Sequence, residues 1–489
     1  MPNPSFMIAA VSSGSGKTVI SCGLMAAFGQ RGLRVAACKC GPDYIDPMFH
    51  REVLGIESEN LDLYFSKKKI LQDLFHRHAE RADITVIEGV MGYYDGISLD
   101  SEKASSYDVA RTLKTPVILV VSCKGMALSI LPIIRGIMEF REDSHICGII
   151  LNRVSSVLYP RMKDMIQKGL KKTGSAVPVI GHVPENPAFG LKSRHLGLVI
   201  PQEISSIQEQ MEQAGKILSE TVELDTLLSI AGCERSIETG TSRRHRPLQS
   251  LEKDENNNKN SLLEEENVRI GIARDEAFCF YYKDNLEYLA RAGCELISFS
   301  PLHDAVLPEN IHGLILGGGY PELYTAELEA NVSMLTSIKA AINDGIPCLA
   351  ECGGFMYLHE EMEDASGAVR KMAGVLPEKA FYTDKLVRFG YIELEARWDG
   401  TFLKKGEKLR GHEFHYWDST DNGVDCIAVK PDRKRSWECI HMKENLFAGY
   451  PHIHFYSNVK FAERFITECR KRRCRGFEHG KDKRADSSC

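Results

Sequence analysis

Cys352 stands where an apolar segment meets two glycines, in the sequence PCLAECGGFMYL (347–358). The residues before it have the pattern of a buried strand, and those after it have apolar side chains at helical spacing. This is the layout of a nucleophile elbow, in which a tight turn exposes the reacting side chain. The N-terminus of a helix favours a thiolate and presents N–H groups to a developing oxyanion. We therefore expect Cys352 to be a nucleophile, although most cysteines are packing residues.

A nucleophilic cysteine needs a base nearby in space, and two motifs offer histidines. They are GHEFHYW, with His412 and His415, and GYPHIHF, with His452 and His454. The HxxH and HxH spacings also allow a metal site, although no cysteine or acid completes a ligand set. In the segment GLILGGGYPELY (313–324), a strand-like run ends in three glycines, which either bring backbone close to a reacting group or form a plain turn.

A second candidate site lies near the start of the chain. The apolar run FMIAAV leads into SSGSGKT (12–18) and then into a helical pattern, the context of a phosphate-binding loop. Glycines let backbone N–H groups turn toward phosphate oxygens, Lys17 adds positive charge, and the Thr18 hydroxyl can ligate Mg²⁺. The full GxxxxGK[ST] pattern is not met, because Val11 occupies the first glycine position. We assign nucleotide binding to Ser13, Gly14, Ser15, Gly16, Lys17 and Thr18.

Acidic residues follow the next two strand-like runs. KCGPDYIDPMFH (39–50) contains Asp43 and Asp46, and IEGVMGYYDG (87–96) has Glu88 as its second residue. Carboxyl ends of parallel strands share one edge of a sheet, so these acids should meet the glycine loop. The alternative for each aspartate is a turn-forming role. Because Mg²⁺ prefers hard oxygen ligands, we expect it at Thr18, Asp46 and Glu88.

The apolar pattern predicts the scaffold that positions these residues. In the first half, six nearly continuous apolar runs alternate with helical stretches, which predicts a mainly parallel sheet covered on both faces by helices. A helical pattern over 203–231 closes this unit. A second alternation begins at Val268, and strands and turns predominate after about Gly374. The predicted fold class is therefore α/β in both halves.

Length and composition predict the domain organisation. With 489 residues, the chain is too long for one ordinary domain. Residues 236–267 are polar, charged and asparagine-rich, which indicates a mobile linker, with an exposed helical hairpin as the alternative. We expect a phosphate-binding domain over 1–235, a cysteine-nucleophile domain over 268–470 and a polar tail over 471–489.

The charge balance excludes some classes of partner. The chain has 61 Lys and Arg against 67 Asp and Glu, a net charge of -6, which argues against a dedicated nucleic-acid binder. No apolar run reaches the roughly 18–20 residues that span a bilayer, and the first residues lack a basic signal region. The fifteen cysteines form no CxxC pair. We expect a cytoplasmic protein with small-molecule partners, no nucleic acid and no membrane, with a homodimer as an open alternative.

Four motifs occur together and in order: KCGPDYIDPMFH, ECGGFMYL, RGHEFHYW and YPHIHF. In these the chain resembles the cobyrinic acid a,c-diamide synthase family of cobalamin biosynthesis, over nearly all of both halves. The resemblance implies a P-loop fold like that of dethiobiotin synthetase, followed by a flavodoxin-like domain of the class I glutamine amidotransferase type. Ser12 stands where partitioning-ATPase relatives carry a signature lysine.

For the second domain, the resemblance implies glutamine hydrolysis. Cys352 would attack the side-chain amide of glutamine to give a thioester and ammonia, with His452 as the base. Most class I amidotransferases have a glutamate two residues after this histidine, but here the residue is His454, which leaves the third member of the catalytic group open. The resemblance assigns the oxyanion hole to the N–H groups of Gly353 and either Gly318 or Gly319.

For the first domain, the resemblance implies an amide ligase. A carboxylate of a corrin dicarboxylate would attack the γ-phosphate of Mg-ATP, and ammonia would then displace phosphate from the acyl phosphate, at the a and c side chains in turn. A sheltered route for ammonia is expected. ATP and glutamine are the co-substrates, with Mg²⁺ as cofactor. The residues implied are Asp43, Asp46 and Glu88 in the acyl-phosphate step and Asn152 at the nucleotide base.

Several alternatives remain at this point. The same chemistry could act on hydrogenobyrinate or on nickel-sirohydrochlorin. Cobyric acid synthase is a weaker alternative, because its relatives lack the GPDYIDPMFH motif in this form. A nucleotide-switched assembly or partitioning ATPase would use the phosphate loop but would leave Cys352 and His452 unexplained.

Overall fold

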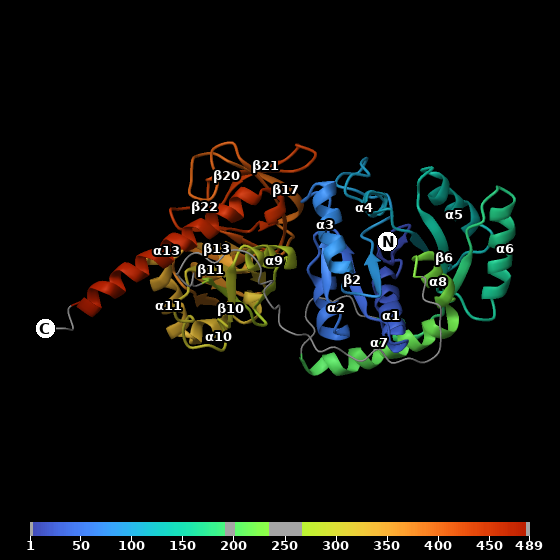
Figure 1. Ribbon diagram of the computed structural model, residues 1–489, viewed down its shortest axis with the longest axis horizontal. Coiled ribbons are helices and arrows are strands. Elements are labelled where there is room, and N and C mark those ends of the chain that lie inside the picture. The colour runs from blue at the N-terminus through green and yellow to red at the C-terminus, as the bar shows by residue number, and fades with distance from the viewer. Residues whose placement is uncertain (1–2, 191–200, 234–266, 486–489) are drawn as a thin grey trace, which may run out of the picture.

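The computed structural model describes residues 3–190, 201–233 and 267–485. It contains two α/β units, each built on a mainly parallel sheet, side by side along the long axis of the molecule (Figure 1). The linker predicted over 236–267 lies, apart from Asn267, outside the described residues. The boundaries that we placed around it therefore remain predictions.

The first unit is built on a seven-stranded sheet in the order β3-β2-β4-β1-β5-β6-β7, in which every neighbouring pair is parallel. The six strands predicted from apolar runs are present. The sequence pattern missed β3, because its residues SENL are mostly polar and it lies at the edge of the sheet. The strands are β1 (Ser5–Ala10), β2 (Val35–Cys40), β3 (Ser58–Leu61), β4 (Ile84–Glu88), β5 (Val117–Ser122), β6 (Ile146–Asn152) and β7 (Val179–Val183).

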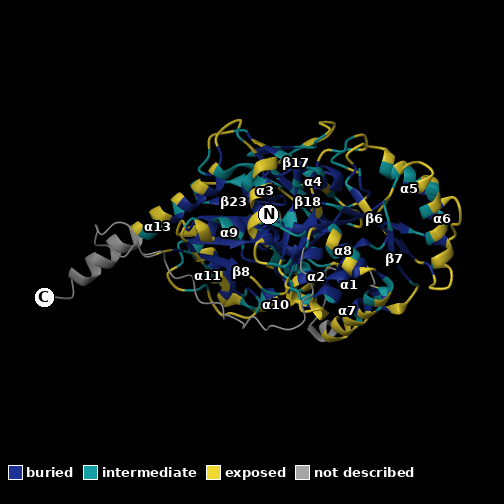
Figure 2. Cartoon of the chain, turned by 45° about the vertical axis from the view of Figure 1, so that its right-hand side comes forward, coloured by how far each residue is buried: buried dark blue, intermediate teal, exposed yellow. Residues whose placement is uncertain are grey.

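Helices cover both faces of this sheet, as predicted, and each face has its own apolar core. Figure 2 shows the sheets buried and the outer surfaces of α5, α6 and α7 exposed. One core contains residues of α1 (Lys17–Gln30), α2 (Ile45–Leu54), α7 (Pro201–Thr221) and α8 (Leu224–Ile230). The other contains residues of α3 (Lys68–Ala79), α4 (Ser106–Leu113), α5 (Ile130–Glu139) and α6 (Tyr159–Lys171).

The second unit has a six-stranded sheet in the order β10-β8-β11-β13-β23-β22, parallel except for the last pair. Its strands are β8 (Val268–Ala273), β10 (Cys294–Phe299), β11 (Gly313–Leu316), β13 (Cys348–Glu351), β22 (His441–Met442) and β23 (Leu446–Gly449). The surrounding helices are α9 (Lys283–Arg291), α10 (Thr325–Ala330), α11 (Val332–Asn343), α12 (Gly353–Tyr357) and α13 (Val459–Ala485). Helix α13 extends through most of the segment over 471–489 that we expected as a polar tail.

The strands expected after about Gly374 are present and form additional sheets, together with four strands that precede Gly374. A five-stranded antiparallel sheet has the order β21-β20-β17-β18-β24, a four-stranded sheet has the order β15-β14-β16-β19, and β12 pairs with β9. The bounds are β9 (Phe278–Phe280), β12 (Gly318–Gly319), β14 (His359–Glu363), β15 (Val369–Lys371), β16 (Leu376–Tyr382), β17 (Arg388–Ala396), β18 (Lys408–His415), β19 (Trp417–Ser419), β20 (Cys426–Val429), β21 (Ser436–Cys439) and β24 (His452–Ile453). Single 3₁₀ turns are η1 (Pro187–Phe189), η3 (Pro321–Leu323) and η4 (Phe455–Ser457).

The two units contact each other through polar groups and aromatic rings. The Tyr391 hydroxyl donates a hydrogen bond to Asp62 at 2.7 Å, and Lys283 pairs with Glu57 at 2.6 Å. Tyr282 of the second unit is buried within an apolar core of the first. These contacts hold the carboxyl edge of the first sheet against the second unit. Among the helices that the structure describes, none is long and apolar enough to cross a membrane.

Candidate active site

The phosphate loop connects β1 to α1 and uses two glycines in left-handed conformations. Gly14 has φ 73° and Gly16 has φ 90°, values that residues with a side chain rarely adopt. A Cβ on Gly16 would lie 2.7 Å from the amide nitrogen of Asn152. That nitrogen donates a hydrogen bond to Ser15 O at 2.8 Å, so Asn152 at the end of β6 supports the loop directly.

Lys17 points back along the loop from the first position of α1. Its ammonium donates hydrogen bonds to Ser12 O at 3.1 Å and to Met91 O at 2.5 Å. Burial and the neighbouring Lys39 lower the pKa of Lys17 to about 8. A buried ammonium held only by carbonyl oxygens is poised to exchange them for a phosphate anion.

A buried cluster of charges lies directly behind the loop. Thr18 Oγ1 donates a hydrogen bond to Glu88 Oε1 at 2.6 Å, and the Lys39 ammonium bonds to the same oxygen at 2.7 Å and to Asp46. His50 Nε2 lies 3.5 Å from Glu88 Oε2. Burial would raise the pKa of Glu88, but Lys39 and His50 outweigh it and hold the pKa below its ordinary value. Glu88 is therefore ionised at neutral pH.

The structure thus brings Thr18, Asp46 and Glu88 together, and it adds two residues that our sequence analysis did not assign, Lys39 and His50. Both lie in the KCGPDYIDPMFH motif, and a lysine inside an apolar strand was the signal for the first. Asp43 differs from the other acids. Its Oδ1 accepts the Ile45 N–H at 2.8 Å, which is the turn-forming role considered above.

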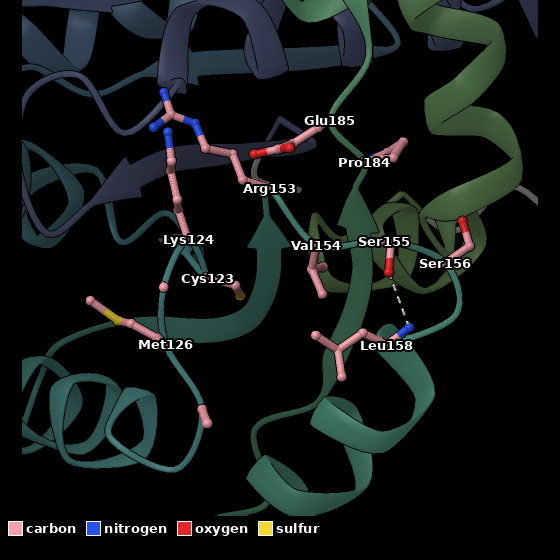
Figure 3. Close-up of a pocket in the computed structure, with 12 residues that line it drawn as sticks. Cys123, Lys124, Met126, Arg153, Val154, Ser155, Ser156, Leu158, Pro184 and Glu185 are labelled. Carbon is pink, nitrogen blue, oxygen red and sulfur yellow. Dashed lines mark hydrogen bonds between the residues drawn. The ribbon is translucent and has the colours of Figure 1, made fainter.

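A cavity of about 590 Å³ adjoins Asn152 at the carboxyl ends of β5, β6 and β7. Figure 3 shows Lys124 and Arg153 extending toward each other at one side of it, with Glu185 near Arg153. The Asn152 side chain itself is engaged by Ser15 and by the Arg153 N–H at 2.8 Å and does not line the space. Lys124 and Arg153 are the two basic residues among those that do. We did not single them out, although each closely follows an apolar strand.

Cys352 occupies the turn between β13 and α12 with φ 49° and ψ −104°, an unusual conformation for a residue with a side chain. Such strain is characteristic of nucleophile elbows. A Cβ on Gly353 would lie 2.8 Å from Pro321 Cδ and 3.2 Å from Gly319 N, so the turn requires glycine there. Gly353 is the first residue of α12, so its N–H has no acceptor within that helix.

His452 follows in β24 and is buried next to Cys352. Its Nδ1 lies 3.7 Å from Glu351 Oε2, the residue immediately before the cysteine. Burial would lower the pKa of His452, but Cys352 and Glu351 raise it to about 10. Glu351 therefore stands where a third member of the group is needed, and the sequence pattern did not reveal it. Gly318 lies against the His452 ring, because a Cβ there would collide with Cε1.

The other motif histidines have different surroundings. His454 is buried 3.8 Å from Asp284, and its ring stacks on Phe65 at 5.0 Å. His415 stacks on Tyr450 at 3.9 Å. Within the described ranges, one group of three ligand-type side chains could hold a metal ion, and it contains none of the four motif histidines: Glu378, Asp421 and His441.

A cavity of about 990 Å³ lies between the two units and extends from the Cys352 site to residues next to the phosphate loop. On one side it is lined by Cys352 and His452, and on the other by Asp43 and Met91, whose carbonyl oxygen accepts the Lys17 hydrogen bond. Gly319, and not Gly318, lines this space. Cys352 therefore faces a chamber that extends to Met91, the hydrogen-bond partner of Lys17, although none of the loop residues 12–18 lines it.

This fold and site define a class of protein, the glutamine-dependent ligases that combine a P-loop domain with an amidotransferase domain. Residues 6–198 match the family model described as the CobQ/CobB/MinD/ParA nucleotide binding domain, and residues 269–460 match the CobB/CobQ-like glutamine amidotransferase domain. The chain belongs to the cobyrinate a,c-diamide synthase family.

Curated relatives with that name match almost the whole chain. The cobyrinate a,c-diamide synthase of Caldanaerobacter subterraneus subsp. tengcongensis is 38% identical, over 95% of this chain and 98% of that protein. The enzymes of Listeria monocytogenes serotype 4b and Salmonella typhimurium are 39% and 36% identical, over 93% and 95% of this chain and 96% and 98% of theirs.

Proposed function

We propose that the protein amidates the a and c carboxylates of cobyrinate, using ATP to activate each carboxylate and glutamine as the source of ammonia. The observation that carries this proposal is the chamber lined by Cys352 and His452 on one side and, on the other, by Met91, whose carbonyl oxygen accepts a hydrogen bond from Lys17 of the phosphate loop. It gives ammonia a sheltered path from one site to the other. Shelter matters because ammonia that escapes becomes ammonium, which is not a nucleophile.

In the glutamine site, Cys352 attacks the side-chain amide of glutamine, and the C–N bond breaks as the thioester forms. His452, whose pKa is raised to about 10, carries the proton that the departing ammonia requires. The N–H groups of Gly353 and Gly319 stabilise the oxyanion. We prefer Gly319 to Gly318 because Gly319 N lies beside Gly353, whereas Gly318 packs on the His452 ring.

In the ligase site, Lys17 and the loop N–H groups hold the phosphates of ATP, and the substrate carboxylate attacks the γ-phosphate in line. Thr18, Asp46 and Glu88 fit Mg²⁺, because all offer oxygen donors and Glu88 Oε2 is buried without a hydrogen bond. When bound, Mg²⁺ would neutralise phosphate charge. Lys39 holds the two carboxylates in place, so that the metal site keeps a fixed geometry.

The base and ribose of ATP fit the 590 Å³ cavity next to the loop. Asn152 then acts as a support for the loop at Ser15, and Lys124 and Arg153 line the nucleotide site. In this proposal the domain boundaries remain at 235 and 268, and a cytoplasmic location and a homodimer remain predictions from the sequence.

The test is a mass-spectrometric assay of the purified protein with ATP, glutamine and one of three substrates: cobyrinate, hydrogenobyrinate or nickel-sirohydrochlorin. Two successive replacements of a carboxyl by an amide on cobyrinate are expected. Faster conversion of another tetrapyrrole would reassign the substrate. ATP hydrolysis without amidation of any of them would contradict the ligase function and would favour a nucleotide-switched ATPase.

A further inference from the structure

The outer wall of the chamber carries aromatic side chains that face solvent. Phe389 of β17 and Phe414 of β18 are cross-strand partners with ring centroids 5.7 Å apart, and Tyr416 continues the row 5.9 Å from Phe414. Phe389 is 59% exposed and Phe414 is 48% exposed. All three line the chamber. Adjacent exposed aromatic rings at a cavity mark a surface that binds an apolar partner.

The facing wall comes from the first unit and is also apolar. The loop after β4 contributes Met91, Ile97 and Leu99, and Leu99 is fully exposed. The chamber mouth is thus a slot with apolar side chains on both walls, one from the second unit and one from the loop after β4. A flat apolar molecule would bury these surfaces on both of its faces.

Positive charge stands at the rim of this slot, in the turn between β20 and β21. Lys434 and Arg435 line the chamber and are exposed, and neither side chain forms an ion pair with any other described residue. Lys430 lines it too, but its ammonium donates to the carbonyl oxygens of Phe389 and Tyr391. The acid in this turn, Asp432, accepts the Lys434 N–H at 3.1 Å.

We propose that this slot is the binding site of the macrocycle: the aromatic row packs against its flat face, and Lys434 and Arg435 bind carboxylates that are not being amidated. This inference rests on the proposed function and deepens it. A tetrapyrrole polycarboxylate combines an apolar ring system with several anionic side chains, which is the complement of this surface. With peripheral carboxylates held at the rim, one reactive carboxylate is directed toward the phosphate loop.

Arg433 provides a matched control within the same turn. Arg433 is positively charged, as Lys434 and Arg435 are, but it does not line the chamber, and it pairs with Glu393 at 3.9 Å. Direct binding of cobyrinate to the full-length protein is measured by absorbance titration without ATP. The double variant K434A/R435A should raise the Kd for cobyrinate by at least about tenfold, because each lost charge-assisted contact contributes substantially to the binding free energy. R433A should stay within about twofold.

Two further arms keep the result interpretable. The product in which only the a and c carboxyls are amidated keeps the other carboxylates, so its binding should remain sensitive to K434A/R435A. A form in which all carboxyls are amidated should bind the wild-type protein and the double variant equally. F414A should weaken the binding of all of these ligands, because the contact that Phe414 makes is apolar. F414W should retain binding. Unchanged cobyrinate affinity in K434A/R435A would overturn the inference. If the wild-type protein binds cobyrinate but does not amidate it, the proposed function fails instead.

Discussion

The ring of Tyr44 lies 5.0 Å, centroid to centroid, from the imidazole of His452, although the two residues belong to different units. Tyr44 immediately precedes α2, whose Asp46 pairs with Lys39 beside Glu88. A single turn of chain therefore joins the charge cluster of the ligase site to the base of the glutamine site. The Tyr44 side chain is buried, and its hydroxyl forms no hydrogen bond within the described structure.

We predict that Tyr44→Ala impairs the use of glutamine more than the use of ammonia. Loss of the ring leaves His452 without a packing partner on that side, so glutamine-dependent amidation should fall about 10- to 100-fold. Ammonia-dependent amidation, measured at saturating substrate, should change only a few-fold. Tyr44→Phe should restore both rates, because the hydroxyl is unpaired. An equal loss with both nitrogen sources would instead place Tyr44 with the acceptor substrate.

A second prediction concerns Glu351 and the pH dependence of glutamine hydrolysis. His452 has a raised pKa of about 10, so it is protonated below that pH and loses its proton as pH rises through it. Because departing ammonia needs that proton, kcat/KM for glutamine should decline at high pH. Glu351→Gln removes a carboxylate that raises this pKa, so the decline should begin about one pH unit lower. Glu360→Gln, at an exposed site on β14, is the control. An unmoved profile in Glu351→Gln would contradict a positioning role.

A third prediction separates the phosphate site from the glutamine site. Lys17→Ala and Glu88→Gln should each reduce amidation by at least about 100-fold with either nitrogen source, because both groups act on the ATP side. Basal glutamine hydrolysis should persist, since neither residue lines the Cys352 pocket. Lys69→Ala, on the exposed face of α3, should be neutral. ATP-dependent turnover that survives in Lys17→Ala would contradict the phosphate-site assignment.

The sequence predicted the first sheet well because its strands are buried on both faces and therefore read as continuous apolar runs. It missed β3, an edge strand whose polar residues carry no such signal. Cys352 and Glu88 stood out because each lies at the end of a strand, and Lys17 because a glycine loop joins it to the end of β1. The carboxyl ends of strands converge in a parallel sheet.

Other parts of the site depend on tertiary contacts that spacing does not encode. Glu351 precedes the nucleophile in sequence, but its relation to His452 appears only when β13 and β24 come together. Likewise, Lys39 of β2 and His50 of α2 contact Glu88 only because β2, β4 and α2 pack together. The chamber between the units depends on their packing, which neither half of the sequence specifies alone.

The central claim is that one chain makes ammonia at Cys352 and uses it at a separate ATP site. The most direct measurement compares Cys352→Ala with Cys348→Ala, a buried cysteine on the strand that leads into the Cys352 turn, for amidation with glutamine and with ammonium salts. Cys352→Ala should lose glutamine-dependent amidation by about 1000-fold or more and keep ammonia-dependent amidation near the wild-type rate. Cys348→Ala should keep both. Loss of both activities in a folded Cys352→Ala protein, or retention of glutamine-dependent amidation, would contradict the account.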